Sequence, residues 1–385
     1  MDQVAKNRAS RGGAPRSSGV AYDYKPDTIC LDEIVESFGL PKENTPQVSL
    51  AMEQYRSIEL DPAVAMQLHQ YVADISSRYH ENNPFHNFAH ACHVTMSVHK
   101  LMKRVVSDGT DELATVVPKN ETKHTATYGI LTSDPLTLLA IVFSGLIHDV
   151  DHRGVSNMQL STEEPVMAQH YRFKSVAEQN SFDIGWDLLM SSSYDALRHA
   201  IFQTLPDLLR FRQVVVNTVL ATDIFDKEMG DMRKARWNRV FGPGDEDSHD
   251  EMSKNTRATI VLEHIIQASD VSHTMQHWHV YTKWNRRLFE EMHLAYKAGR
   301  MGKDPATFWY EGELGFFDNY VIPLAKKLQE CRVFGVSSDE YLQVRYLSKC
   351  CLNHPMLLRR HVRPEAYSPN HLSYPTSHST PSPIA

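Results

Sequence analysis

The feature that most constrains the fold is an apolar run, LTLLAIVFSGLI at positions 136–147, which is followed directly by HDVDHRG. An Asp-Pro pair precedes the run, and Asp can cap a helix that Pro begins. Because the run is apolar on nearly all sides, it predicts a helix buried at the centre of the molecule. His148 and Asp149 would lie at the end of that helix, where a buried imidazole and carboxylate need a partner such as a cation.

The rest of the chain also favours helices. Apolar residues recur at three- and four-residue spacing over residues 63–79 and 340–352, each time after a helix-capping Asp. Short alternating runs typical of strands are scarce, so the sequence predicts an all-α fold with a single large multi-helix domain. Loops are expected at residues 107–128, 242–255 and 297–315, the last being glycine-rich and long enough to be functional.

The composition limits the partners and the cellular compartment that we expect for such a domain. A chain of 385 residues that is 42% hydrophobic can bury a sizeable core, and its net charge of −7 gives no general attraction to nucleic acid or an anionic membrane. The five cysteines lack paired spacing, which suits a reducing compartment. No segment is apolar enough for a secretory signal or long enough to span a membrane. We expect a cytoplasmic protein with disordered tails at residues 1–20 and 367–385.

Further candidate ligands lie far from the apolar run. His86 and His90 in FHNFAHACHV are four residues apart, and we expect them to face the same way on one helical turn. Asp270 ends another apolar, helical-looking run. Together His90, His148, Asp149 and Asp270 suit Zn²⁺ in a site with open positions, and Asp149 can bridge to a second, harder ion such as Mg²⁺. Two such ions can activate a water and polarise a phosphoryl group, so a buried binuclear metal site is predicted.

Five stretches that together indicate a family occur along the chain in the order YHENNPFHNFAHACHV, AIVFSGLIHDVDHRGVSNMQL, SVAEQN, ATD and QASDVSH. Over residues 79–346 the chain closely resembles the catalytic domain of class I cyclic nucleotide phosphodiesterases. The resemblance implies a catalytic domain at residues 21–366 that hydrolyses 3′,5′-cyclic nucleotides to nucleoside 5′-monophosphates and so ends their signal. Cyclic AMP is the first expected substrate and cyclic GMP the second. The implied cofactors are Zn²⁺ and Mg²⁺, with Mn²⁺ as a substitute for Mg²⁺.

The resemblance also implies roles for residues around the metals. His86 matches the general acid that protonates the leaving O3′ after in-line attack by a hydroxide bridging the two metals. His152 and Glu178 match positions that hold the metal waters and the phosphate, and Asp223 matches a further acidic residue that lines the same pocket. For Asp223 a helix cap or a surface ion pair is the alternative. Asp151 matches none of these roles, and we expect it to cap or brace the turn.

The purine site is the least constrained part of the resemblance. Leu288 and Phe316 match the family's hydrophobic clamp, although both could equally be core residues. Glu313 stands where the family carries a glutamine, and an ionised carboxylate can only accept hydrogen bonds, which puts base selectivity in doubt. The same pocket is expected to take small-molecule inhibitors, and an oligomer is compatible with the sequence.

Other departures are smaller. Phe85 replaces a frequent tyrosine, QNSF follows Glu178 in place of histidines, and His273 replaces a frequent asparagine. The departures suggest a divergent branch of the family, for which a protozoan origin is one candidate.

Three rival hypotheses differ in their tests. A generic HD-type phosphohydrolase would lack the HNxxH element and the segment around Phe316, both of which are present here. A silent sensor or scaffold would bind nucleotide without turnover, against which the complete ligand set argues. A purely structural metal is usually held by cysteines in a closed site.

Overall fold

The computed structural model describes residues 60–103, 105, 135–242, 251–276, 278–331, 333 and 334 of the chain. The described residues are mostly helical, and the single β-type pairing among them is an isolated antiparallel bridge between Val105 and Phe334. The prediction of a single all-α domain is therefore confirmed. The two tails, the expected loop at residues 107–128 and the expected helix at residues 340–352 lie outside the described residues.

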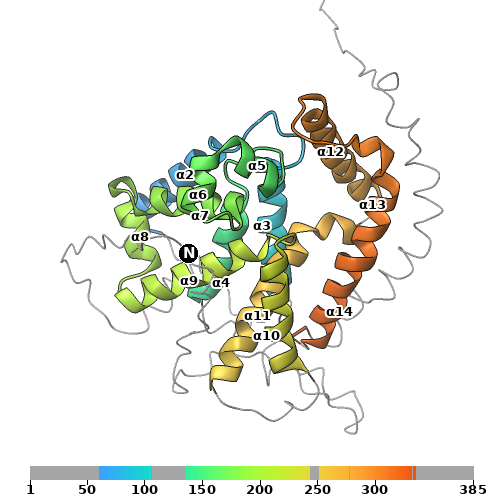
Figure 1. The fold of residues 1–385 in the computed structure, drawn as a ribbon. Coiled ribbons are helices and arrows are strands. Elements are labelled where there is room, and N and C mark those ends of the chain that lie inside the picture. The colour runs from blue at the N-terminus through green and yellow to red at the C-terminus, as the bar shows by residue number, and fades with distance from the viewer. Residues whose placement is uncertain are drawn as a thin grey trace, which may run out of the picture.

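The helices form a bundle around three central members. In chain order the α-helices are α2 (Pro62–Ser76), α3 (Phe88–Met102), α4 (Pro135–Ile147), α5 (Asn157–Glu163), α6 (Pro165–His170), α7 (Val176–Met190), α8 (Asp195–Ile201), α9 (Leu205–Ala221), α10 (Lys227–Phe241), α11 (Glu251–Asp270), α12 (Trp278–Lys297), α13 (Trp309–Phe316) and α14 (Ile322–Glu330). Short 3₁₀ turns are η3 (Ser192–Tyr194), η4 (Ser272–Met275) and η5 (Pro305–Thr307), and η6 (Phe317–Val321) is a π-helical turn. Helices α3, α4 and α11 lie between α2 and α6–α9 on one side and α12–α14 on the other (Figure 1).

Helix α4 is the buried centre that its apolar sequence predicts. It packs against both α3 and α9. Ile141 and Ile147 are fully buried, and the hydroxyl of Thr218 on α9 donates to the Ser144 hydroxyl at 2.7 Å. At Gly145 an added Cβ would lie only 3.1 Å from the Cα of Thr95, so glycine permits the close approach of α3. The end of α4 is thereby fixed against α3, the helix that carries His90.

Two predicted loops are partly helical. Helix α11 begins at Glu251, inside the expected loop at residues 242–255, and the expected loop at residues 297–315 contains η5 and α13. The glycines of the second segment disfavour a helix, but Trp309 and Glu313 are buried on α13. Burial of these side chains against neighbouring elements therefore overrides the local propensity.

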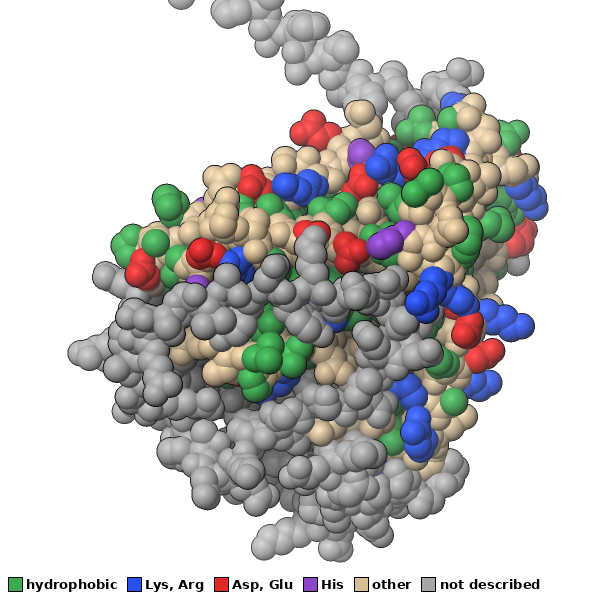
Figure 2. Space-filling model, turned by 60° about the vertical axis from the view of Figure 1, so that its left-hand side comes forward, with side chains coloured by type: hydrophobic (Ala, Val, Ile, Leu, Met, Phe, Trp, Pro, Cys, Tyr) green, Lys and Arg blue, Asp and Glu red, His purple; other side chains and the backbone are tan. Residues whose placement is uncertain are grey.

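The surface carries mixed charge. On the face drawn in Figure 2, basic and acidic side chains are interspersed, in agreement with the modest net charge. Among the helices that the structure describes, none combines the length and the apolar character that crossing a membrane requires.

Candidate metal and acid site

Three helix ends bring the predicted metal ligands together. His90 lies in the first turn of α3, His148 and Asp149 directly follow α4, and Asp270 is the last residue of α11. His90 Nε2 is 2.9 Å from Asp270 Oδ1, and His148 Nε2 is 3.0 Å from Asp149 Oδ2. The crossed pairs, His90 with Asp149 and His148 with Asp270, are 3.8 and 3.7 Å apart. Both imidazoles are buried, so the four side chains converge on one small volume.

The hydrogen bonds around this group favour a cation. His148 Nδ1 contacts the Gly145 carbonyl oxygen at 3.0 Å, and because a carbonyl only accepts, Nδ1 carries the proton. The lone pair of His148 Nε2 then faces Asp149, and Nε2 is buried without a well-aligned hydrogen bond. A lone pair opposite carboxylates repels them unless a proton or a metal ion lies between. The residues therefore fit a metal ion, and second contacts such as that of Nδ1 are typical of metal-binding histidines.

The electrostatics agree with this fit. Burial opposes protonation of His148, but the adjacent Asp149 charge outweighs it and raises the pKa of His148 well above its ordinary value. Burial likewise opposes ionisation of Asp149 and Asp270, yet the neighbouring histidines lower the pKa of both carboxyls. The group thus attracts positive charge, which is what a metal site requires.

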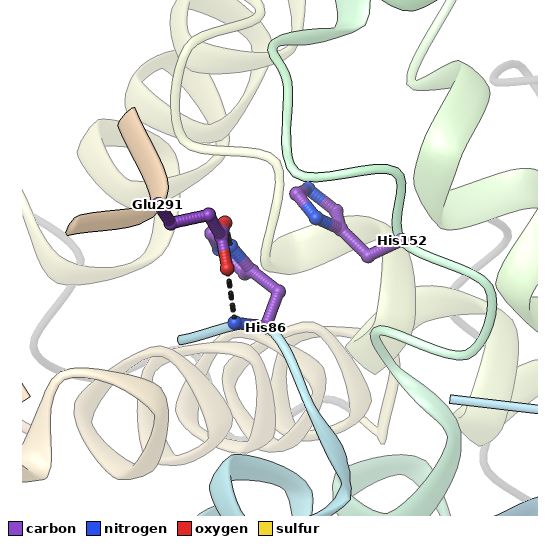
Figure 3. A group of neighbouring side chains, drawn as sticks. All are labelled: His86, His152 and Glu291. Atoms are coloured by element: carbon purple, nitrogen blue, oxygen red, sulfur yellow. Dashed lines mark hydrogen bonds and ion pairs between the residues drawn. The ribbon is translucent and has the colours of Figure 1, made fainter. Parts of the chain in front are cut away.

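Two further histidines and a carboxylate form a second group, which is drawn in Figure 3. His86 precedes α3, His152 lies in the turn after α4, and Glu291 comes from α12. The rings of His86 and His90 have centroids 6.2 Å apart. The prediction that His86 and His90 share a helical turn is wrong, because Asn87 caps α3 by accepting from the His90 amide at 3.1 Å.

Glu291 makes three contacts with Phe85 and His86, two of them with His86. One carboxylate oxygen accepts from the backbone N–H groups of Phe85 and His86, each at 2.9 Å, and the other contacts His86 Nδ1. Burial would lower the pKa of His86, but the Glu291 charge outweighs it and raises the pKa to about 9. His86 is thus protonated near neutral pH, with its Nδ1 in contact with Glu291.

His152 has the opposite character. Its Nδ1 accepts from the Gly154 N–H at 3.2 Å, so the neutral ring carries its proton on Nε2. Burial and the nearby His86 charge lower the pKa of His152 to about 4. The two rings stack with centroids 3.8 Å apart, a charged ring against a neutral one. This group therefore presents N–H donors, whereas the first group presents lone pairs.

Two predicted carboxylates are joined by a residue that the sequence reading did not assign. Asn157 at the start of α5 donates from Nδ2 to Glu178 at 2.9 Å and to Asp223 at 3.2 Å, and its Oδ1 accepts from the Ala177 amide at 2.8 Å. Burial and the neighbouring Asp223 charge raise the pKa of Glu178 to about 8. Close carboxylates of this kind suit the water shell of a divalent cation.

The three residues predicted for purine binding lie on α12 and α13. Leu288 is half-buried, Phe316 stacks on Tyr320 with centroids 5.4 Å apart, and Glu313 is buried. Glu313 accepts a 2.5 Å hydrogen bond from the hydroxyl of Tyr281. Burial raises the pKa of Glu313 to about 7, only partly offset by that bond. The assignment of these residues to the base stays a prediction.

Glu291 and Asn157 are the site residues that sequence reasoning missed. Glu291 lies 205 residues from His86 and has no pattern that ties it to the HNxxH element. Asn157 does lie within a stretch that carries the family resemblance, GVSNMQL, which was the available signal. Their roles follow from contacts between distant segments.

Comparison with known proteins identifies the family. A family pattern described as 3′5′-cyclic nucleotide phosphodiesterase matches residues 85–333. A probable 3′,5′-cyclic-AMP phosphodiesterase, pde-4, of Caenorhabditis elegans is 26% identical over 320 residues, which cover 78% of this chain and 41% of that protein. The 3′,5′-cyclic-AMP phosphodiesterase 4C of Rattus norvegicus is 28% identical over 232 residues, covering 58% of this chain and 37% of that protein. The chain thus spans about two fifths of the length of these relatives.

Solved structures share the fold. The phosphodiesterase domain of the RhoPDE fusion protein from the choanoflagellate Salpingoeca rosetta superposes with a TM-score of 0.57 at 20% identity, covering 78% of this chain and 86% of that one. A second structure, of the phosphodiesterase domain of the rhodopsin phosphodiesterase from the same organism, gives a TM-score of 0.58, also at 20% identity, and covers 77% and 82% of the two chains. Because the family pattern covers more than half of the sequence, this chain belongs to the 3′5′-cyclic nucleotide phosphodiesterase family.

Proposed function

We propose that this chain hydrolyses 3′,5′-cyclic nucleotides to nucleoside 5′-monophosphates, with cyclic AMP as the first substrate and cyclic GMP as the second. The observation that carries the proposal is the pairing of a lone-pair-rich metal group with a protonated histidine whose ring centroid lies 6.2 Å from that of His90. The curated relatives with similar sequences are named as cyclic-AMP phosphodiesterases. Hydrolysis of a phosphodiester needs both parts, because the leaving alkoxide requires a proton and the phosphate requires charge neutralisation.

The proposed cofactors are Zn²⁺ at His90, His148, Asp149 and Asp270, and Mg²⁺ or Mn²⁺ on the other side of Asp149. When bound, the cations supply positive charge that lowers the pKa of water and polarises the phosphoryl group. Glu178 and Asp223 would accept hydrogen bonds from the waters around the second cation. Asn157 keeps these two carboxylates together.

His86 performs the proton transfer in this proposal. Water attacks phosphorus in line with O3′ and loses one proton to the solvent, the P–O3′ bond breaks, and the proton on His86 Nε2 passes to O3′, after which His86 is protonated again from the solvent. His86 Nδ1 keeps its proton, which it donates in a hydrogen bond to Glu291, and the Glu291 charge keeps the His86 ring protonated before the reaction. The Nε2–H of neutral His152, whose ring stacks on that of His86, would donate to a phosphate oxygen.

The purine is proposed to lie between Leu288 and Phe316, with Glu313 at its edge. The same pocket would take small-molecule inhibitors with flat aromatic rings. We further propose that the catalytic domain spans residues 21–366 and works in the cytoplasm, which the unpaired cysteine pattern supports.

The test is hydrolysis of cyclic AMP and cyclic GMP side by side with added Mg²⁺, together with the metal content of the purified protein. We expect turnover in the wild type and in His69→Ala, which changes an exposed histidine on α2. In His86→Ala we expect a fall in kcat of about a hundredfold or more with unchanged zinc content. Absence of turnover in folded, metal-loaded wild type would refute the proposal and favour a silent sensor or another phosphoester.

A further inference from the structure

The turn that follows α4 carries residues of both histidine groups, so its shape matters to both. Asp149 belongs to the metal group and His152 stacks on His86, and the two are separated only by Val150 and Asp151. Asp151 has a φ of 61°, in the left-handed region of the backbone. Residues with a side chain rarely occupy this region, and Asp and Asn are among the few that tolerate it. A residue in this conformation persists only when its surroundings hold it there.

Asp151 is held by four hydrogen bonds. Its backbone N–H donates to the Arg78 carbonyl at 3.2 Å. One carboxylate oxygen lies 2.7 Å from His80 Nε2, and because a carboxylate only accepts, His80 is the donor. The other oxygen accepts from Arg153 at 3.1 Å and from Asn180 at 3.2 Å. The carboxylate is largely enclosed, with 19% of the side chain exposed.

The side-chain donors come from three segments that carry residues of the site. His80 lies in the segment that leads to His86, six residues later, and Asn180 lies on α7 two residues after Glu178. Arg153 comes from the turn itself. A single carboxylate thus cross-links the segments that supply the general acid, the acidic residue of α7 and the metal ligand Asp149.

Neighbouring contacts act in the same direction. The Asn83 side-chain amide donates to the carbonyl oxygens of His152 at 2.7 Å and of His86 at 3.1 Å. The Ser181 hydroxyl on α7 donates to the Val150 carbonyl at 2.7 Å. The backbone on both sides of Asp151 is therefore tied to the same two segments, and Asp151 is the member whose side chain reaches both.

We propose that Asp151 is a positioning residue, whose left-handed backbone and three-way carboxylate contacts hold Asp149 in the metal group and His152 against His86. It touches neither substrate nor metal in this assignment. Its effect on turnover rests on the proposed function, whereas its effect on metal retention does not.

Three substitutions separate the backbone contribution from the side-chain contribution. Asp151→Gly keeps the left-handed conformation accessible but removes all side-chain contacts. Asp151→Asn tolerates the conformation and keeps one acceptor oxygen, and Asp151→Ala loses both features. Glu81→Ala, an exposed acid next to His80, is the matched control. The readouts are kcat and KM, the rate of zinc loss to a chelator, and the visible spectrum of the Co²⁺-substituted protein.

We expect kcat to fall about tenfold to a hundredfold in Asp151→Gly, with faster zinc loss and an altered Co²⁺ spectrum, while KM changes by less than about threefold. Asp151→Asn should recover part of each loss, and Asp151→Ala should be the most impaired. His80→Asn and Asn180→Ala should each reproduce part of the Gly effect and add little to it in double variants.

The proposal is overturned if folded Asp151→Gly and Asp151→Asn match the control in kcat, zinc retention and Co²⁺ spectrum. If Asp151→Ala fails to fold, the Gly and Asn variants still decide. If the wild type hydrolyses no cyclic nucleotide, the proposed function fails, but the zinc and Co²⁺ readouts still test Asp151.

Discussion

Two neighbouring groups in this molecule each combine two histidines with carboxylate, and they have opposite chemistry. The members of the first are His90, His148, Asp149 and Asp270, and those of the second are His86, His152 and Glu291. In the first, His148 Nδ1 is committed to a backbone carbonyl and its Nε2 lone pair faces carboxylate oxygens. In the second, the carboxylate already accepts from two backbone amides and contacts His86 Nδ1.

The difference lies in what else each group bonds to. Burial opposes ionisation of Glu291, but the charge of His86 and the hydrogen bonds from His86 outweigh it and lower the pKa of the Glu291 carboxyl to about 2. His152 turns its N–H toward the site because its Nδ1 accepts from Gly154. Residue composition alone would assign a metal to both groups. The surrounding hydrogen bonds instead suit the first group to a metal ion and the second to a proton.

The largest expected effect comes from removing one negative charge from the first group. Asp270→Asn removes a carboxylate that lies 2.9 Å from His90 Nε2, and we expect loss of zinc and a fall in kcat/KM of about a thousandfold or more. Glu291→Gln makes the same chemical change in the second group and should retain full zinc content. Metal analysis of both purified variants checks this, and equal zinc loss in the two would remove the distinction.

The next largest effect concerns the proton. As the proposed general acid, His86 acts in its protonated state, which is present below its pKa of about 9 and lost as the pH rises through that value. Glu291→Gln removes the charge that raises this pKa, so the alkaline limb of kcat/KM should move toward the ordinary imidazole range near pH 6.5. At pH 8, a pKa near 6.5 leaves about 3% of the ring protonated where a pKa near 9 leaves about 90%, so we expect kcat/KM to fall about thirtyfold at that pH.

Glu290→Gln on the same helix is the control for the pH profile, since Glu290 is the neighbouring acid and Glu291 makes the contacts to His86. An alkaline limb that stays in place in Glu291→Gln would show that another group titrates there. In that case Glu291 would matter for the position of His86 but not for its charge.

Much of the metal group could be predicted from sequence, because its ligands sit at the ends of strongly patterned helices. The apolar run before His148 leaves little choice but a buried helix, and Asp270 ends α11 as its sequence indicates. The prediction that His86 and His90 lie on one helical turn is wrong, because their spacing does not reveal that Asn87 caps the helix between them.

The second group could not be predicted in full, for a physical reason. Glu291 reaches His86 only because α12 packs beside the segment that precedes α3, and its local sequence contains two adjacent acids with nothing to rank them. Helix α13 was not predicted for a related reason. Burial of Trp309 against distant segments outweighs the low helix propensity of its two glycines. Contacts between distant segments determine both features.

The smallest expected effect extends the comparison to a third buried carboxylate. Glu313 accepts a hydrogen bond from Tyr281, whereas Glu291 accepts hydrogen bonds from two backbone amides and contacts an imidazole. Burial raises the pKa of Glu313 to about 7, whereas the pKa of Glu291 is lowered. Below that pKa Glu313 is neutral and can both donate to and accept from a purine edge, whereas above it the carboxylate can only accept. As the pH rises through about 7, KM for cyclic AMP and cyclic GMP should therefore rise about threefold to tenfold, the worth of one hydrogen bond.

Glu313→Gln donates and accepts at every pH, so its KM should be lower than that of the wild type above about pH 7 and nearly independent of pH. Glu311→Gln, an exposed position on the same helix, should follow the wild type. Michaelis constants for both nucleotides across the pH range test this. If the wild-type and Glu313→Gln curves coincide, Glu313 does not contact the base, and the purine edge must be read by another side chain.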